Sequence, residues 1–150
     1  DLFRSLLADN RQLIAMHEEI SLCRQYLNLE HLRLGERLQV QWTIDPGAED
    51  ALVPPMLLQP LVENAVYHGI EPGLAAGTIE IRVGMEGDRV VVGLSNPYHA
   101  EHQHRSGNRM ALANIRERLQ LHFDVEAKLD AGVDGERYRI GMVMPYRRAA

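Results

Sequence analysis

Residues 53–69, VPPMLLQPLVENAVYHG, are the stretch around which we interpret the rest of the chain. Pro54 and Pro55 suit the start of a helix, because missing amide protons are no loss there and φ is already set. The apolar residues that follow recur at helical spacing and predict one buried stripe, formed by Leu58, Leu61, Val62 and Ala65. Pro60 must lie in the first turn of this helix or kink it, since proline removes one backbone hydrogen bond.

The other face of the predicted helix is polar. Asn64 and His68 are four residues apart and therefore stack on one face, with Tyr67 beside them. The amide oxygen of Asn64 can enter the octahedral shell of Mg²⁺, an ion that usually reaches proteins with phosphates attached. The alternative is a core helix whose polar face simply meets water.

The bulk composition is that of one ordinary globular domain. The chain has 150 residues, is 45% apolar and carries a net charge of −5. We therefore expect no direct binding to nucleic acid or to an anionic membrane. Cys23 is the only cysteine, which excludes an internal disulfide and fits a reducing compartment. No apolar run approaches the ~20 residues that a membrane span needs.

The hydrophobic pattern predicts an α+β fold. Alternating residues indicate strands, helical spacing indicates helices, and Gly or Pro marks the turns between them. The expected order is a helix over 1–36, a strand over 38–44, the helix within 53–69, strands over 79–83 and 90–94 joined at Gly87-Asp88, a long loop over 95–108, a helix over 110–121, a strand over 125–129, a turn over 130–135 and a strand over 138–144. Consecutive antiparallel strands with helices gathered on one face predict a two-layer α/β sandwich rather than a doubly wound parallel sheet.

Two segments carry a resemblance to a known family. LQPLVENAVYHG (58–69) closely resembles the N box of sensor histidine kinases, in particular of the LytS/YehU type that signals to LytTR response regulators. RSGNRMALANIRERL (105–119) is most similar to the AlgZ/FimS-type members, and the whole resemblance extends over residues 17–145. It implies the GHKL ATP-binding fold shared by gyrase, Hsp90, histidine kinases and MutL: a mixed, mostly antiparallel sheet with helices on one face, preceded by a helical segment.

The resemblance also implies a division of the chain. Residues 1–36, with their EE…YLxLExxR run, correspond to the C-terminal part of the dimerisation and phosphotransfer helices, and residues 37–150 to the ATP-binding domain. We therefore expect a homodimer contact through the helical segment, and a helix docked within its own chain is the alternative. The phospho-accepting histidine of the family lies in a motif that this sequence lacks. We expect it upstream of Asp1 and interpret His17 as a surface residue.

In the family, ATP binding needs a ligand for the metal ion, a residue that recognises adenine and hydrogen-bond donors for the phosphates. The resemblance assigns Mg²⁺ to Asn64 and the adenine amino group to Asn96, which stands where the family has aspartate; aligning Ser95 there is the poorer alternative. The Gly-rich box GxGxGL is reduced to GNRMAL at 107–112, which keeps only the first glycine. The implied ATP-binding residues are Asn64, Tyr67, His68, Asn96, Gly107, Asn108, Arg109, Met110, Leu112 and Arg116.

Two departures from the family pattern bear on the chemistry. Tyr67 stands where many kinases of this class carry a phosphate-neutralising lysine, and Pro60 stands where gyrase- and Hsp90-like ATPases carry the glutamate that activates water. Hydrolysis by a polarised water is therefore disfavoured, whereas phosphoryl transfer to an external nucleophile mainly needs positioning and charge stabilisation. His99, His102 and His104 have a metal-ligand spacing, but we interpret their loop as a solvated ATP lid.

The leading hypothesis is the ATP-binding catalytic domain of a sensor histidine kinase, cytoplasmic in a protein anchored in the bacterial inner membrane. It would use Mg²⁺ and ATP and pass the γ-phosphoryl group through an upstream histidine to a LytTR-type, AlgR-like response regulator. The alternative is a degenerate GHKL domain with weak or no ATP binding that acts as a dimerising protein-interaction module. A serine kinase of the anti-sigma-factor type shares the fold but leaves residues 17–36 unexplained.

Overall fold

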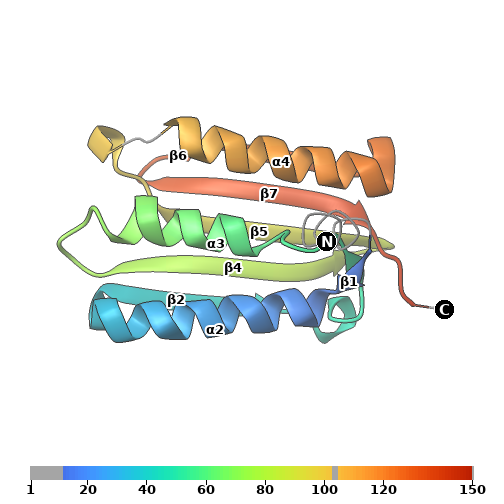
Figure 1. Cartoon of the computed structure of the whole chain (residues 1–150), viewed down its shortest axis with the longest axis horizontal. Coiled ribbons are helices and arrows are strands. Elements are labelled where there is room, and N and C mark those ends of the chain that lie inside the picture. The colour runs from blue at the N-terminus through green and yellow to red at the C-terminus, as the bar shows by residue number, and fades with distance from the viewer. Residues whose placement is uncertain (1–11, 103–104, 150) are drawn as a thin grey trace, which may run out of the picture.

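The computed structural model describes residues 12–102 and 105–149, without the side chains of residues 102 and 105–108. It has two layers: a five-stranded sheet, and the helices α2, α3 and α4, which lie side by side over one face of that sheet (Figure 1). This arrangement confirms the predicted α+β two-layer sandwich. None of the described helices is long and apolar enough to cross a membrane.

The sheet is mixed and mostly antiparallel, as expected. Its strands lie in the order β2 (Leu38–Ile44), β4 (Gly77–Glu86), β5 (Arg89–Pro97), β7 (Arg137–Pro145) and β6 (Lys128–Asp134). β2 and β4 are parallel, with Leu38 opposite Gly77, because a helical crossover connects them. The remaining neighbours are antiparallel, and Gly87, with φ 62°, makes the predicted tight turn between β4 and β5.

Helices and short elements connect these strands. The longer helices are α2 (Met16–Leu34), α3 (Gln59–Ala65) with its π-helical continuation η3 (Val66–Ile70), and α4 (Arg105–Phe123). The short elements are β1 (Ile14–Ala15), which pairs with β3 (Leu52–Val53), and the turns η1 (Gly35–Arg37), η2 (Pro46–Ala48), η4 (Ala100–His102) and η5 (Asp124–Glu126).

One core fills the space between the helices and the sheet. The inward residues of the strands alternate with outward ones, so each strand contributes every second side chain. The helices contribute their apolar stripes, including the one predicted for α3. The largest fully buried side chains are those of Met16, Leu38, Leu57, Leu58, Leu61, Ile70, Ile79, Ile81, Ile115, Phe123, Met142 and Met144.

The helix α2 docks on its own chain. Its stripe of Met16, Ile20, Cys23, Leu27 and Leu34 belongs to the same core as the sheet. The alternative of an intramolecular helix is therefore realised for this stripe. The outer face of α2 keeps its leucines in solvent, and the dimer contact expected from the sequence stays a prediction.

Three element boundaries differ from those expected. The helix expected over 1–36 is α2, which begins at Met16 because β1 precedes it, and residues 1–11 of that prediction lie outside the described residues. α3 begins at Gln59 rather than at Pro54, and Pro60 lies in its first turn as required. α4 begins at Arg105, so the loop expected over 95–108 is shorter, because its polar sequence lacks the apolar spacing that predicts a helix.

The predicted C-terminal hairpin is also shifted. We expected a strand over 125–129 and a turn over 130–135, but residues 124–126 form η5, and β6 runs from Lys128 to Asp134. The turn lies at Gly135, with φ 63°. β6 is an edge strand with a single buried residue, Leu129, so it lacks the alternation that reveals a strand in sequence.

Candidate functional site

The helix α3 carries the polar residues that the sequence singles out. Its stripe of Leu58, Leu61, Val62 and Ala65 is buried, and Asn64 lies off that stripe. The helix then widens into a π-helical turn over Val66–Ile70, a distortion that is frequent at functional sites. Asn64 on α3 and His68 on the π-helical turn line the same pocket.

A buried carboxylate fixes the start of α3. Glu19 on α2 accepts hydrogen bonds from the backbone amides of Met56 (3.0 Å), Leu57 (2.9 Å) and Leu58 (3.0 Å). No side chain of the preceding residue caps the helix, so Glu19 satisfies amides that a helix start leaves unpaired. The negative charge also suits the positive end of the helix dipole.

The same segment is held from the other side by α4. Arg118 donates from Nη1 to the carbonyl oxygens of Pro55 (2.6 Å) and Met56 (2.8 Å). Met56 has φ 60°, a left-handed conformation that is costly for a residue with a side chain. The contacts of Glu19 and Arg118 on either side of Met56 hold this strained turn in place.

The sequence reasoning missed Glu19 and Arg118 as site-building residues. In the sequence, Glu19 belongs to the EE…YLxLExxR run and Arg118 to the RSGNRMALANIRERL segment, and neither motif assigns them a role in the site. The only available signal was a charged residue within an otherwise apolar helical spacing, and this does not identify a partner thirty-seven or more residues away in sequence.

The end of β5 supplies the second asparagine. Asn96 is only 5% exposed and lies on the helix side of the sheet, whereas Ser95 faces the opposite side. Ser95 donates to Glu80 Oε2 (3.0 Å) and accepts from Arg137 (2.8 Å). Strand alternation therefore separates the two alternatives for the residue that recognises adenine, and only Asn96 lies beside α3.

The contact between β5 and η3 requires a glycine. A Cβ at Gly69 would lie 2.7 Å from Asn96 Nδ2 and 2.9 Å from its Cβ. The Gly69 carbonyl oxygen is also 2.9 Å from His99 Nε2. Asn96 itself donates from Nδ2 to the Pro97 carbonyl oxygen at 2.8 Å, which leaves its amide oxygen as an acceptor.

Asn64, His68 and Asn96 line one pocket, together with Leu61, Ala65, Pro97, Tyr98, His99, Tyr138 and Ile140. Its volume is about 20 Å³, enough for roughly one water molecule, whereas sites for small organic ligands usually have about 300 Å³ or more. Among the described residues, the buried Asn64 Nδ2 has no hydrogen-bond partner. An unpaired amide beside Asn96 fits a polar ligand, and the pocket must open to admit a nucleotide.

Of the other residues predicted to bind ATP, those whose side chains the structure describes do not line this pocket. Tyr67 is 52% exposed, with its ring edge-on to that of His68, and Arg109 and Met110 on α4 are also exposed. Leu112 is part of the core. Arg116 lines a separate hollow with Leu119, Lys128 and Asp130. Gly107 and Asn108 belong to the first turns of α4, and their side chains lie outside the described part of the chain.

The histidines considered in the sequence lie in different parts of the structure. His17 is exposed at the start of α2, in agreement with a surface role. His99 lines the pocket, while the side chains of His102 and His104 lie outside the described residues. Within the described residues, no group of three His, Cys, Asp or Glu side chains could hold a metal ion. Any Mg²⁺ here would depend on Asn64 and on the oxygens of its ligand.

No protein-family model matches the chain, but several curated proteins do. It is 32% identical over 124 residues to the sensor histidine kinase YpdA of Escherichia coli, an alignment covering 77% of this chain and 22% of YpdA. It is 30% identical over 161 residues to the sensor protein LytS of Staphylococcus saprophyticus, covering 96% of this chain and 27% of LytS. The chain thus spans about a quarter of the length of these relatives.

Solved structures of histidine kinases share the fold. The catalytic domain of histidine kinase ThkA superposes with a TM-score of 0.66 at 16% identity, covering 91% of this chain and 97% of that domain. Full-length ShkA in complex with AMPPNP superposes with a TM-score of 0.62 at 20% identity, covering 92% of this chain and 32% of ShkA. At these identities the likeness concerns the fold alone.

Proposed function

This chain is a relative of the LytS-type sensor histidine kinases and has the fold of a histidine kinase catalytic domain. On that premise we propose that it binds Mg²⁺-ATP in the pocket between α3 and the end of β5. The observation that carries the proposal is that Asn64 and Asn96, from different elements, line one pocket. A relative in fold, ShkA, was solved in complex with the ATP analogue AMPPNP.

The two asparagines have different roles in this proposal. The amide oxygen of Asn64 ligates Mg²⁺, which when bound neutralises charge on the phosphates. The amide oxygen of Asn96 accepts a hydrogen bond from the adenine amino group. Because an amide lacks the charge of the family's aspartate, this bond is weaker by about 1 kcal/mol. The α4 residues Gly107, Asn108, Arg109 and Met110, at the N-terminal end of that helix, are proposed to approach the phosphates.

The acceptor of the phosphoryl group is proposed to lie outside this domain. The γ-phosphoryl group passes to a histidine outside this segment and then to a response regulator, proposed to be of the LytTR type. The proposed parent protein is a membrane-anchored homodimer with this domain in the cytoplasm. Adding the upstream helices of the parent and measuring acid-labile phosphate from labelled ATP tests the transfer step directly, with the histidine-to-alanine variant of the acceptor as control.

Calorimetric titration of the chain with Mg²⁺-ATP tests the binding step. We expect sub-millimolar affinity that Asn64→Ala abolishes. Asn28→Ala, which changes an exposed asparagine on α2, is the matched control and should bind as the parent chain does. A folded domain that gives no heat at millimolar nucleotide would refute the proposal.

That negative result has a specific alternative. The pocket volume of about 20 Å³ and the exposed tyrosine at position 67 also fit a degenerate domain that acts as a protein-interaction module. A folded chain that fails to bind nucleotide but associates with its regulator would establish this second function.

A further inference from the structure

The face of the sheet turned away from the helices carries an unusual set of glycines. Gly84 in β4, Gly93 in β5, Gly132 in β6 and Gly141 in β7 all lie on this face, and a Cβ added to any of them meets no atom within 4 Å. None has a positive φ, so any residue could adopt the backbone there. Glycine inside an uninterrupted strand often marks a place where another molecule approaches closely.

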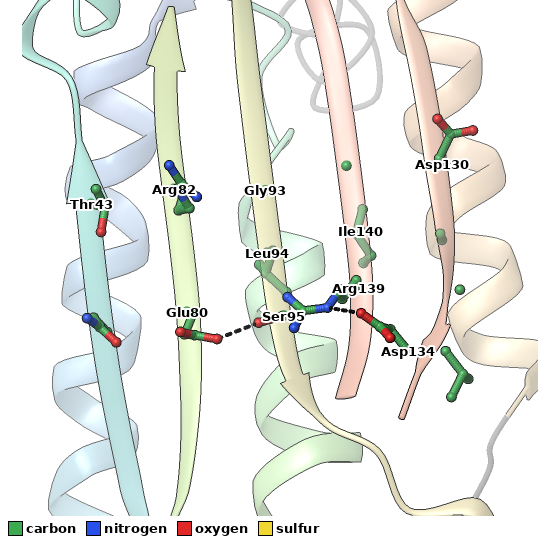
Figure 2. Close-up of a pocket in the computed structure, with 15 residues that line it drawn as sticks. Thr43, Glu80, Arg82, Gly93, Leu94, Ser95, Asp130, Asp134, Arg139 and Ile140 are labelled. Carbon is green, nitrogen blue, oxygen red and sulfur yellow. Dashed lines mark hydrogen bonds and ion pairs between the residues drawn. The ribbon is translucent and has the colours of Figure 1, made fainter. Parts of the chain in front are cut away.

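Three of these glycines, Gly93, Gly132 and Gly141, line a broad hollow. Gly93 and Gly141 are direct cross-strand neighbours, with Arg82 beside Gly93 and Asp130 beside Gly141. The hollow has a volume of about 920 Å³ and extends across the sheet, as Figure 2 shows. In the part of the chain that the structure describes, Arg82 and Asp130 form no ion pair, unlike Arg139, which pairs with Asp134 at 2.9 Å.

We propose that this face docks against the same face of a second copy of the chain. A two-fold axis parallel to the strands and above the Gly93–Gly141 pair places β4 of one copy over β6 of the other. Arg82 then faces the second copy's Asp130, and the reverse pair forms by symmetry. An axis perpendicular to the strands would instead bring each Arg82 toward its own symmetry mate, which like charges disfavour.

The neighbouring rows fit the same operation. Lys128, in line with Val143, Val91 and Gly84, comes to lie over the second copy's Gly84. Glu80, in line with Ser95, Arg139 and Gly132, comes to lie over the second copy's Gly132. The glycines thus provide room for the long side chains of the facing copy. The proposal does not depend on nucleotide binding.

The size of the face predicts a weak dimer. The axis between β5 and β7 leaves β2 outside the overlap, so four strands of each copy are in contact. Four strands about 4.8 Å apart and about seven residues long give about 450 Å² per copy and about 900 Å² in total. Stable interfaces bury about 1,200–2,000 Å², so association is expected only at high concentration. Because salt screens the two ion pairs between Arg82 and Asp130, association should weaken as salt is added.

Sedimentation equilibrium of the chain, from micromolar to millimolar concentration, tests the proposal. We expect the average mass to rise from 17.0 kDa toward twice that value. Arg82→Asp and Asp130→Arg should each weaken association about tenfold or more, because each creates like-charge contacts, and the double variant should restore it. Arg148→Asp, an exposed arginine outside this face, is the control and should associate normally.

Three outcomes would overturn the proposal. The chain could remain at 17.0 kDa up to millimolar concentration. The two charge reversals could leave association unchanged while Leu29→Asp on the outer face of α2 abolishes it, which would place the interface on that helix. The double variant could fail to recover association although circular dichroism shows it folded, which would mean that Arg82 and Asp130 do not face each other.

Discussion

Gly69 lies so close to Asn96 that a methyl group at position 69 would come within 2.7 Å of the asparagine amide nitrogen. The contact joins η3 to the end of β5, the two elements that form the candidate nucleotide pocket. The position of Asn96 therefore depends on the absence of a side chain at residue 69.

Gly69→Ala should displace Asn96 and weaken Mg²⁺-ATP binding about tenfold, with a loss of stability of about 1–3 kcal/mol from overpacking. Gly73→Ala is the matched control, since its nearest neighbour, in the ring of His99, would lie at an ordinary 3.4 Å. Calorimetry and urea unfolding of both variants measure the two effects. Equal affinities in the two variants would show that Asn96 does not contact the nucleotide.

Glu19→Gln should destabilise the domain by about 2 kcal/mol. The variant loses charge-assisted hydrogen bonds and turns one amide NH₂ group toward backbone donors that now lack an acceptor. The adjacent Glu18→Gln is exposed and should change stability by less than about 0.5 kcal/mol. Chemical denaturation of the two variants measures their free energies of unfolding. Similar small losses of stability in both would contradict the capping role assigned to Glu19.

Met56→Gly tests the strain in the turn that Glu19 and Arg118 hold. Releasing a left-handed non-glycine residue gains about 1–2 kcal/mol, which the greater freedom of the unfolded glycine partly offsets. We expect a net gain of about 0.5 kcal/mol. Met110→Gly, at an exposed site on α4, should instead lose about 1 kcal/mol. A loss of the same size at both positions would show that Met56 is not strained.

Burial raises the pKa of the Cys23 thiol from 9.0 to about 12, with further contributions from Glu19 and Glu63. The folded state then holds a proton that the unfolded state has released, so stability is fully present below pH 9 and falls as the pH rises toward 12. The slope from this group should approach about 1.4 kcal/mol per pH unit. Burial also raises the pKa of Tyr26 to about 12, which adds to the loss above pH 10.

Urea unfolding of the parent chain and Cys23→Ala between pH 8 and pH 10.5 measures this slope. The variant should be less stable at pH 8, because a buried side chain is lost, but its stability should fall less steeply with pH. Parallel curves for the two proteins would show that the thiol ionises normally in the folded state.

The sequence predicted the parts of the fold in which apolar residues recur at a regular spacing. The buried stripe of α3, the half-buried β2 and the hairpin turn at Gly87 agree with their patterns. The pattern failed at β6, where an exposed edge strand has no buried alternation, and at the start of α4, where the polar sequence resembles a loop. Both failures arise where the sequence lacks the periodic apolar residues that indicate a strand or a helix.

The candidate site was predicted in part for a similar reason. Asn64 and Asn96 were found because a local motif surrounds each of them, and the structure brings them to one pocket. The contacts that set the position of α3 are long-range, from Glu19 on one helix and Arg118 on another, and no local pattern encodes them. The small volume of the pocket likewise depends on side-chain packing that a single sequence does not reveal.

Tyr67→Lys tests whether a positive charge beside the pocket strengthens Mg²⁺-ATP binding. Tyr67 is 52% exposed on η3, one residue from His68, which lines the pocket. A lysine there would bring a positive charge toward the proposed phosphate position, where a gain of about 1 kcal/mol corresponds to about fivefold tighter Mg²⁺-ATP binding. Tyr67→Gln, which removes the ring without adding charge, should leave affinity nearly unchanged. Because the gain is electrostatic, it should shrink as salt is added. A lysine variant that binds no better than the glutamine variant would place the phosphates away from this turn of η3, and the assignment of Tyr67 to the nucleotide site would then be wrong.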